Sequence, residues 1–309
     1  MHPGRKFRSI VCLVAAFFAG SLPCLAYGLD TQRHDYEIVA ADDSEATRRI
    51  VADLRRKIPA AQVFFSQDKH STKGKIPVYI AIGPAGLRTA LAQGVDASIL
   101  SLYTSSQAYH AILEGAPEPH PRQITAIYAE PSPSDQLRLI SMLSKKQGGV
   151  AVILSNKTAY LEPILQAAAA QLKTPLTVEK FNDGDNINRV LNRVADVPAI
   201  LAMPDSAVFN AENIKNILVT TYRRSQPVIG FSAPLVKAGA LASSYSDIED
   251  IDAQADEILN DFDASGKLPD PQFPKYFSVI VNDDVARSLN IVIDEPVKKF
   301  SRKPTVRQP

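Results

Sequence analysis

Short apolar runs alternate with amphipathic segments along almost the whole chain, and this alternation constrains the fold more than any other feature. Most of the runs are apolar on both faces, which is typical of strands in a parallel sheet covered by helices on each side. The predicted strands are Glu37 to Ala41, Gln62 to Phe65, Val78 to Ile82, Ser98 to Leu102, Ile124 to Tyr128, Val150 to Leu154, Leu176 to Lys180, Ala199 to Ala202, Pro227 to Phe231 and Phe277 to Val281. The pattern predicts an α/β fold with doubly wound sheets.

The segments between these strands carry helix signals. Residues 186–195 place four apolar side chains on one helical face, and Asn210 is positioned to cap the helix that follows. Ser246 with Glu249 three residues later has the spacing of a capping box, so we expect a long amphipathic helix to begin there.

The number of strands and two prolines predict a division into two lobes. Ten strands in one twisted open sheet is near the upper limit, so two sheets of about five are favoured. The segment Glu130-Pro131-Ser132-Pro133-Ser134 interrupts the alternation between a strand and a helix, and we expect the chain to cross between lobes there. Residues 294–309 lack apolar periodicity and predict a flexible basic tail, solvated rather than bound to anionic lipid or nucleic acid.

The N-terminal residues have the three parts of a secretory signal peptide. Basic residues come first, an apolar run of 13 residues spans 10–22, and small residues follow. This run is shorter than the ~20 residues of a membrane-spanning helix, although a retained anchor is the alternative. A lipid anchor on Cys24 fits poorly, because Leu22 and Pro23 precede it. We expect residues 1–26 to be the signal, cleaved between Ala26 and Gly28, and the protein to be periplasmic.

Both cysteines, Cys12 and Cys24, lie in this signal. The exported chain would therefore have no disulfide, no cysteine metal ligand and no thiol nucleophile. Because the first 26 residues hold three basic and no acidic side chains, the remainder carries a net charge of about −2. A chain that is 45% hydrophobic over its full length, and mildly acidic after the signal, is neither a disordered segment nor a dedicated nucleic-acid binder, and no nucleic-acid partner is expected.

Catalytic motifs are not evident in the sequence. Gly83-Pro84-Ala85-Gly86 lacks the tight glycine pair and the third glycine of a dinucleotide-binding turn, and residues 230–234 lack the second glycine of a nucleophile elbow. The histidines outside the signal show no metal-ligand spacing; they are His34, His70, His110 and His120. We expect no catalytic residue, no metal and no cofactor.

Polar residues follow the predicted strands at their carboxyl ends. In open α/β sheets, ligands bind at this edge because helix N-termini point their free N–H groups into it. The residues in question are Gly83 and Ala85, Tyr103, Thr104, Ser105 and Ser106, Glu130, Ser155 and Asn156, Asp205 and Ser206, Ser232, and Ser243, Ser244 and Tyr245. Such a set orients a small polar or zwitterionic solute but contains no nucleophile and base pair. For each residue alone, a turn or helix-cap role is the alternative.

Several segments resemble a known family. The most specific is Leu235-Val236-Lys237-Ala238-Gly239-Ala240-Leu241-Ala242, after Gln226 to Ser232 and before a tyrosine and a long helix. Weaker matches are Ile80 to Ala85, Asp135 to Ile140, Ala202 to Asp205, Phe277 to Asn282 and Ala286 to Leu289. Together they resemble the substrate-binding proteins of ABC transporters in the tryptophan-binding, TrpX-like group. The resemblance covers about Pro77 to Ile291.

This resemblance implies a type I periplasmic binding protein, with two Rossmann-like lobes, a three-crossing hinge and a ligand clamped between the lobes. It implies that residues 27–131 and 239–267 form the N-terminal lobe, with a crossing at 239–243. Residues 132–238 and 268–293 would form the C-terminal lobe.

The family's ligand contacts would fall on Thr104, Ser105, Asn156, Asp205, Ser232 and Tyr245. By the family pattern, Asp205 would hold a ligand amino group, and Thr104 or a helix N-terminus would hold a carboxylate. Pro84 departs from the Thr or Ser of relatives, and residues 128–133 lack their small polar side chains. Without tryptophan, an aromatic ligand would be stacked by Tyr or Phe, with Tyr103 and Tyr245 the first candidates.

The leading hypothesis is a monomeric, non-enzymatic binding protein that delivers a small polar solute, such as an amino acid or an aromatic compound, to ABC permease subunits in the inner membrane. The alternative is a sensor on the same scaffold that acts through a non-transport partner. An exported α/β enzyme is the third hypothesis, because a fold alone does not exclude it.

Overall fold

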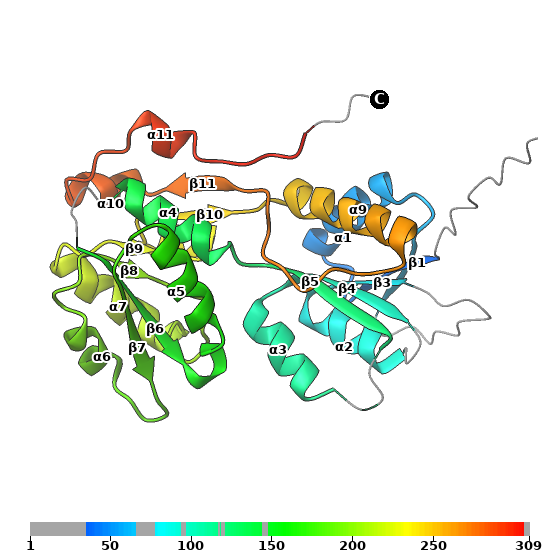
Figure 1. Cartoon of the computed structure of the whole chain (residues 1–309), viewed down its shortest axis with the longest axis horizontal. Helices are drawn as coiled ribbons and strands as arrows, with labels where there is room; N and C mark the ends of the chain where they lie inside the picture. The colour runs from blue at the N-terminus through cyan, green and yellow to red at the C-terminus, as the bar shows by residue number, and fades with distance from the viewer. Residues whose placement is uncertain are drawn as a thin grey trace, which may run out of the picture. The chain divides into compact units, whose positions relative to one another are not determined.

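The computed structural model describes residues 35–65, 78–93, 97–116, 118, 121–143 and 148–305. These residues form two sheets, one of five and one of six strands (Figure 1). The predicted signal peptide, His34, His70, His120 and the end of the tail lie outside the described residues. In the part of the chain that is described, no helix has the length and apolar character needed to cross a membrane.

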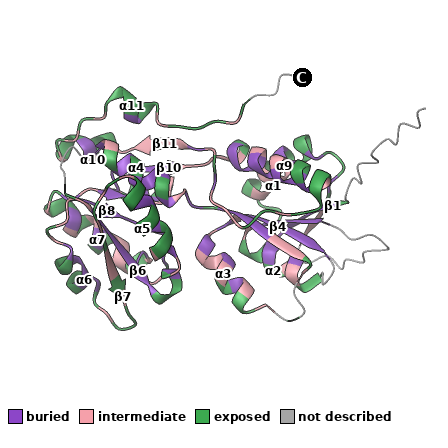
Figure 2. Ribbon diagram, in the orientation of Figure 1, coloured by how far each residue is buried: buried purple, intermediate pink, exposed green. Residues whose placement is uncertain are grey.

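The first sheet is wholly parallel and has the order β2-β1-β3-β4-β5. Its strands are β1 (Tyr36–Ala40), β2 (Gln62–Phe65), β3 (Val78–Ile82), β4 (Ser98–Thr104) and β5 (Gln123–Tyr128). The helices around it are α1 (Glu45–Lys57), α2 (Gly83–Gln93), α3 (Ser106–Glu114) and α9 (Ile248–Ser265). Two apolar clusters, one beneath α1 and α9 and one beneath α2 and α3, cover its two faces. The central strands are therefore buried on both sides, as their continuous apolar runs predict (Figure 2).

The second sheet has the order β11-β10-β9-β8-β6-β7, and only β11 is antiparallel among its described strands. Its strands are β6 (Val150–Ser155), β7 (Leu176–Phe181), β8 (Ile200–Leu201), β9 (Val228–Ile229), β10 (Ala242–Tyr245) and β11 (Ser278–Val281). The accompanying helices are α4 (Pro133–Leu143), η1 (Asn156–Thr158), α5 (Leu161–Gln171), α6 (Ile187–Arg193), α7 (Ala211–Arg223), α8 (Ala233–Ala238), α10 (Asp283–Ser288) and α11 (Glu295–Lys298). Apolar clusters again cover both faces.

Both sheets use the same strand order. If the strands of the second sheet are counted along the chain from β6, its five parallel strands read 2-1-3-4-5, as do those of the first. In sheets of this doubly wound order, ligands generally bind at the carboxyl edge, beside the strand where the order reverses.

The chain passes between the two groups of elements three times. It leaves β5 and enters α4 through residues 129–132, the proline segment that predicts a crossing. It returns between β10 and α9 through only two residues, Ser246 and Asp247. The third passage follows α9, where Gln272 bridges to Ile127 of β5 before the chain reaches β11.

The position of the second passage corrects the sequence-based boundary. Residues 239–267 are predicted to belong to the N-terminal lobe, but Ala242–Tyr245 forms β10, which pairs with β9 and β11 of the second sheet. Only the helix that follows packs with the first sheet. β10 does not form an apolar run in the sequence because it contains serines, although Ser243 and Ser244 are both fully buried.

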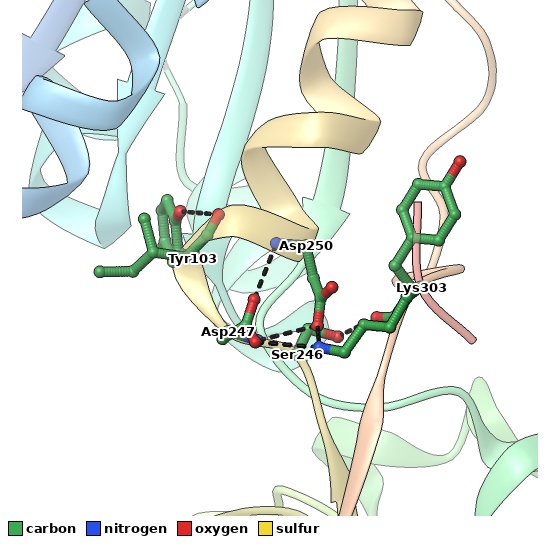
Figure 3. Close-up of polar contacts among 7 residues, drawn as sticks. Tyr103, Ser246, Asp247, Asp250 and Lys303 are labelled. Atoms are coloured by element: carbon green, nitrogen blue, oxygen red, sulfur yellow. Dashed lines mark hydrogen bonds and ion pairs between the residues drawn. The ribbon is translucent and has the colours of Figure 1, made fainter. Parts of the chain in front are cut away.

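The capping box of this helix also differs by one residue from the prediction. The N-cap is Asp247, whose side chain accepts a hydrogen bond from Asp250 N, while the side chain of Asp250 accepts one from Asp247 N. Ser246 instead donates from Oγ to the carbonyl oxygen of Tyr276, at 2.6 Å. Figure 3 shows this group of residues at the start of α9.

The prediction of a flexible tail from residue 294 is wrong for the described part of that segment. Asp294 caps α11, and Val297 is fully buried in the core of the second sheet. Phe300 packs edge to face on Phe277, with 5.1 Å between ring centroids. The tail shows no apolar periodicity because it holds only one short helix and contacts the second sheet's core through single residues, Val297 and Phe300.

Candidate functional site

The candidate site lies at the carboxyl ends of the parallel strands, where the loops of both sheets carry the predicted polar residues. On the first sheet, β3 ends at Gly83, which has a φ of +68° and begins α2. A side chain is strained in that conformation, so glycine allows the strand to turn directly into the helix. Ala85, in the first turn of α2, is exposed. The first helical turn therefore presents backbone and small side chains at this edge.

Tyr103 and Thr104 are held within the first sheet and its helices. Tyr103 has a φ of 58° beside an irregularity in the pairing of β4 with β5, and its hydroxyl donates to Asp252 Oδ1 at 2.6 Å. Thr104 is fully buried, and its Oγ1 accepts from Ser101 at 3.2 Å. Both side chains thus have protein partners, and their contact with a solute stays a prediction.

Ser105 and Glu130 shape the N-terminus of α3. Ser105 is the N-cap, accepting from Ala108 N at 3.2 Å. Glu130 follows β5, is 3% exposed, and accepts from Ser106 N at 2.9 and 3.1 Å and from the Ser106 hydroxyl. Burial raises the pKa of the Glu130 carboxyl, and the hydrogen bonds from Ser106 oppose this rise. Glu130 therefore holds the loop after β4 against the loop after β5.

Asp205 has the corresponding place in the second sheet. It follows β8, is 1% exposed, and accepts from Ser155 N at 2.7 Å and Ser155 Oγ at 3.0 Å, from the Thr158 hydroxyl, and from Ala207 N at 2.9 Å. A carboxylate has about four lone-pair sites, so these donors occupy most of its capacity. Asp205 ties the loop after β6 to the loop after β8. Asn156, in that first loop, is exposed.

Ser232 follows β9 and Tyr245 ends β10, the two remaining parallel strands of this edge. Ser232 is the N-cap of α8 and accepts from Leu235 N at 3.4 Å. Tyr245 is half-buried as the last residue of β10, opposite Ser278 of β11. Ser232 and Ser105 therefore both act as helix caps, which is the alternative to ligand binding that their sequence positions leave open.

Two hydrogen bonds join the edge of the first sheet to that of the second. The hydroxyl of Tyr160, between η1 and α5, donates to Ser106 Oγ on α3 at 2.7 Å. Ser206 N donates to Gln107 Oε1 at 3.2 Å. The ring of His110 lies 4.4 Å from that of Tyr160. Residues that follow β4, β6 and β8 are therefore brought together.

Gln107, His110 and Tyr160 contribute uncharged groups to this junction, and the carboxyls of Glu130 and Asp205 act on Tyr160 from nearby. Burial lowers the pKa of His110, with Glu114 acting in the opposite direction, so its imidazole is neutral at pH 7. Burial also raises the pKa of the Tyr160 hydroxyl, which keeps its proton. Gln107 Nε2 is a buried donor with no hydrogen-bond partner among the described residues, since Oε1 faces Ser206 N. The junction thus offers an amide donor, hydroxyls and an aromatic pair.

Sequence reasoning missed Gln107, His110 and Tyr160 as site residues. Gln107 and His110 lie within α3, beyond the residues that directly follow β4, and Tyr160 follows a short 3₁₀ turn. A signal was available for two of them, because the first turns of a helix after a strand share the carboxyl edge with the loop. Their association depends on contacts between residues about 50 to 100 positions apart, which one sequence does not show.

Neither a protein-family model nor a curated protein matches this sequence. Solved structures do. A substrate-binding protein with adhesive properties from Clostridium difficile, in its ligand-free, open structure, has a TM-score of 0.60 at 13% identity, covering 85% of this chain and 96% of that one. An ABC domain from Streptococcus pneumonia in complex with L-Trp has a TM-score of 0.52 at 16% identity, covering 86% and 98%.

A conserved domain protein from Vibrio cholerae is similar at a TM-score of 0.53 and 16% identity, covering 86% of this chain and 97% of that chain. At these identities the likeness concerns the fold. Two sheets of the same doubly wound order, three passages between them and an antiparallel edge strand on the second are present here. The chain has the two-lobed α/β fold of the type I periplasmic binding proteins.

Proposed function

We propose that this protein binds a small polar solute between the carboxyl edges of its two sheets and delivers it to an ABC permease. The observation that carries the proposal is the hydrogen bond from Tyr160 to Ser106, together with that from Ser206 to Gln107. These bonds bring polar groups of both sheets within reach of one small molecule. Contacts with both sheets at once give a solute the means to favour one arrangement of the two lobes over others.

The chemistry of the junction favours a solute with hydrogen-bond acceptors and an apolar or aromatic part. The unpartnered Nε2 of Gln107 requires an acceptor, for which a carboxylate or carbonyl oxygen is suited. The rings of His110 and Tyr160 provide a surface on which an aromatic group stacks. The Streptococcus protein of similar fold was crystallised with L-Trp, so L-tryptophan is the first probe.

The test uses the chain from Tyr27 onward and measures its melting temperature with a panel of amino acids and related compounds. A bound solute stabilises the folded protein by mass action, by about 2.7 kcal/mol at one hundred times its Kd. The matched variants are Gln107→Ala and Tyr160→Phe at the junction and Tyr222→Phe, an exposed tyrosine on α7, as the control.

We expect at least one solute to raise the melting temperature of the wild type and of Tyr222→Phe, and to do so less for both junction variants. Absence of any shift across the panel contradicts the solute-binding proposal. Equal shifts in all variants place the solute elsewhere and contradict the site.

Delivery to a permease is tested separately, in the periplasmic setting that the proposal implies. Genes for a permease and an ATPase beside the gene for this chain support transport, and solute-dependent stimulation of that ATPase in vesicles tests it. A neighbouring histidine kinase or cyclase gene, with no stimulation, contradicts delivery and favours the sensor.

A further inference from the structure

The last described segment of the chain contacts the second and third passages between the sheets and the start of α4, just after the first passage. We name residues 300–303 the strap. It is anchored in the second lobe: Val297, just before it, is fully buried, and Phe300 packs on Phe277 with the guanidinium of Arg138 5.5 Å from the centre of its ring. The strap therefore begins from a fixed point on α11.

The next contacts are with the third passage, which leads into β11. Arg302 N donates to Phe277 O at 2.9 Å, and Phe277 N donates to Arg302 O at 2.7 Å, so the strap pairs with the passage as an antiparallel bridge. The guanidinium of Arg302 donates to the carbonyl oxygen of Lys275 at 2.9 Å and lies 5.3 Å from the centre of the Phe277 ring. These contacts fix the direction of the strap along the passage.

The same arginine reaches the start of α4, at the end of the first passage. Arg302 Nη2 lies 3.6 Å from Oδ1 of Asp135, which is in the first turn of α4 directly after the proline segment. Burial raises the pKa of Asp135, and the charges of Arg302 and Arg138 oppose this rise. The charge of Arg302 thus opposes the effect of burial on the Asp135 carboxyl, at the start of α4.

Lys303 forms ion pairs with the second passage and with the first turn of α9. Its Nζ lies 2.9 Å from Asp247 Oδ2 and 2.7 Å from Asp250 Oδ2, the two residues of the α9 capping box (Figure 3). Hydrogen bonds to Asp250 and Asp247 raise the pKa of Lys303 although desolvation acts to lower it. Because Ser246 also donates to Tyr276 O, the second and third passages are joined to each other as well as to the strap.

We propose that the strap regulates solute binding by restraining the hinge in the arrangement that brings Tyr160 to Ser106 and Ser206 to Gln107. Only Ser246 and Asp247 connect β10 to α9, so a rotation there moves Asp247 relative to Lys303 and loosens the ion pairs. The side chains of Lys303 and Asp247 are 45% and 39% exposed, so their ion pair breaks at modest cost and the strap adjusts the motion rather than preventing it, while the pair with the buried Asp250 holds the end of the strap on α9. The effect on affinity rests on the proposed function; the restraint itself does not.

The restraint is tested without any solute, by the distance between two spin labels on the chain from Tyr27 onward, which has no native cysteine. The labels are placed at Ala111→Cys on α3 and Ala167→Cys on α5, both exposed. Lys303→Met removes the grip on the second passage. The matched control is Lys299→Met, since Lys299 pairs at 3.6 Å with Glu295 of its own helix and touches no passage in the described structure.

We expect a broader or displaced distance distribution in Lys303→Met and an unchanged one in Lys299→Met. Arg302→Gln, which weakens the contacts with the start of α4 and with the third passage, provides a second test with the same expectation. Thermal unfolding of each variant shows that it is folded. Distributions identical to wild type in both Lys303→Met and Arg302→Gln overturn the restraint.

The regulation is then tested by titration calorimetry with a solute identified by the melting panel. Lys303→Met is expected to raise its Kd by about two- to fivefold relative to Lys299→Met, the range for a half-exposed ion pair. A Kd that is unchanged or lowered overturns the regulatory role. If no solute binds any variant, the proposed function fails, while the distance measurement still decides whether the strap restrains the hinge.

Discussion

The hydroxyl of Tyr103 donates a 2.6 Å hydrogen bond to Asp252, which joins the irregular end of β4 to the first turns of α9. Asp252 is fully buried, and its second oxygen, Oδ2, has no hydrogen-bond partner among the described residues. Oδ2 of Asp53, on the adjoining helix α1, is likewise buried without a hydrogen-bond partner among the described residues. A buried acidic pair therefore lies between α1 and α9.

This pair predicts a pH-dependent stability. Desolvation raises the pKa of Asp252 to about 8; the Tyr103 hydrogen bond opposes this rise, the neighbouring Asp53 adds to it, and Lys57 opposes it. The folded chain binds the proton of the Asp252 carboxyl more tightly than the unfolded chain does. The protonated carboxyl therefore makes its full contribution to the free energy of unfolding below about pH 4, and this contribution is lost as the pH rises to about 8. Its slope is at most about 1.4 kcal/mol per pH unit.

Asp252→Asn is expected to flatten this dependence and to be more stable than wild type at pH 8, measured by urea unfolding between pH 5 and 8. Burial raises the pKa of Glu130 in the same direction, so the difference between variant and wild type is the readout. Asp261→Asn, at an exposed position of α9, serves as the control. A slope equal to that of wild type in Asp252→Asn would show that this carboxyl does not titrate in the range.

Asp205→Ala is expected to lower the free energy of unfolding by about 3 kcal/mol, because it leaves the donors of Ser155 and Thr158 buried without an acceptor. Asp205→Asn, which keeps one carbonyl oxygen, should lose less. The exposed Asp183→Ala should change stability by less than about 0.5 kcal/mol. If Asp205→Ala unfolds at the same urea concentration as Asp183→Ala, the bonding assigned to Asp205 is wrong.

Glu130→Gln and Glu130→Ala separate the charge of this residue from its hydrogen bonds. Glutamine keeps an acceptor for Ser106 N and avoids the desolvation that raises the pKa of the carboxyl. We therefore expect Glu130→Gln to remain within about 1 kcal/mol of wild type and Glu130→Ala to lose about 2 kcal/mol. Chemical denaturation measures both, and an equal loss in the two variants would argue against the acceptor role.

Gly86→Ala tests the close approach of α2 to β1. A Cβ at Gly86 would lie 2.5 Å from the carbonyl oxygen of Val39, so the helix must shift, at a cost of about 1 to 3 kcal/mol. At Gly115, by contrast, the nearest atom to a Cβ is the carbonyl oxygen of Ala111, at 3.6 Å. Gly115→Ala is accordingly expected to be neutral, and thermal melting of the two variants compares them. Similar melting temperatures would contradict the tight packing at Gly86.

The fold was predictable from the sequence wherever a strand is apolar on both faces. β3 and β6 are fully buried runs that periodicity identifies without tertiary information. β10 is different, because its serines are buried by virtue of Gln136, whose Oε1 accepts from Ser244 N at 2.9 Å and whose Nε2 donates to Ser243 Oγ at 3.3 Å. That partner is more than 100 residues away in the chain, so local pattern gives no sign of it.

The sequence predicts which loops lie at this edge, but the contact of their residues with a solute stays a prediction. The rule that ligands bind at the carboxyl ends of strands led to loops that the structure brings together, such as those after β4, β6 and β8. The rule does not show which polar side chains are occupied by hydrogen bonds within the protein, as those of Thr104 and Asp205 are. Donor and acceptor pairing is a tertiary property, and the unpartnered amide of Gln107 became visible only after that pairing was known.

Glu130 and Asp205 are fastened to the loops of their own sheets, and this separates two kinds of position along the edge. Substitutions at Glu130 and Asp205 disturb the backbone of the loops they bind. Ala85 and Asn156, by contrast, are exposed, and their side chains hold no loop in the described contacts. Mutational libraries at 85 and 156 should therefore yield folded proteins with altered solute preference. The architecture permits specificity to diverge through a few surface side chains while the frame that presents them stays unchanged.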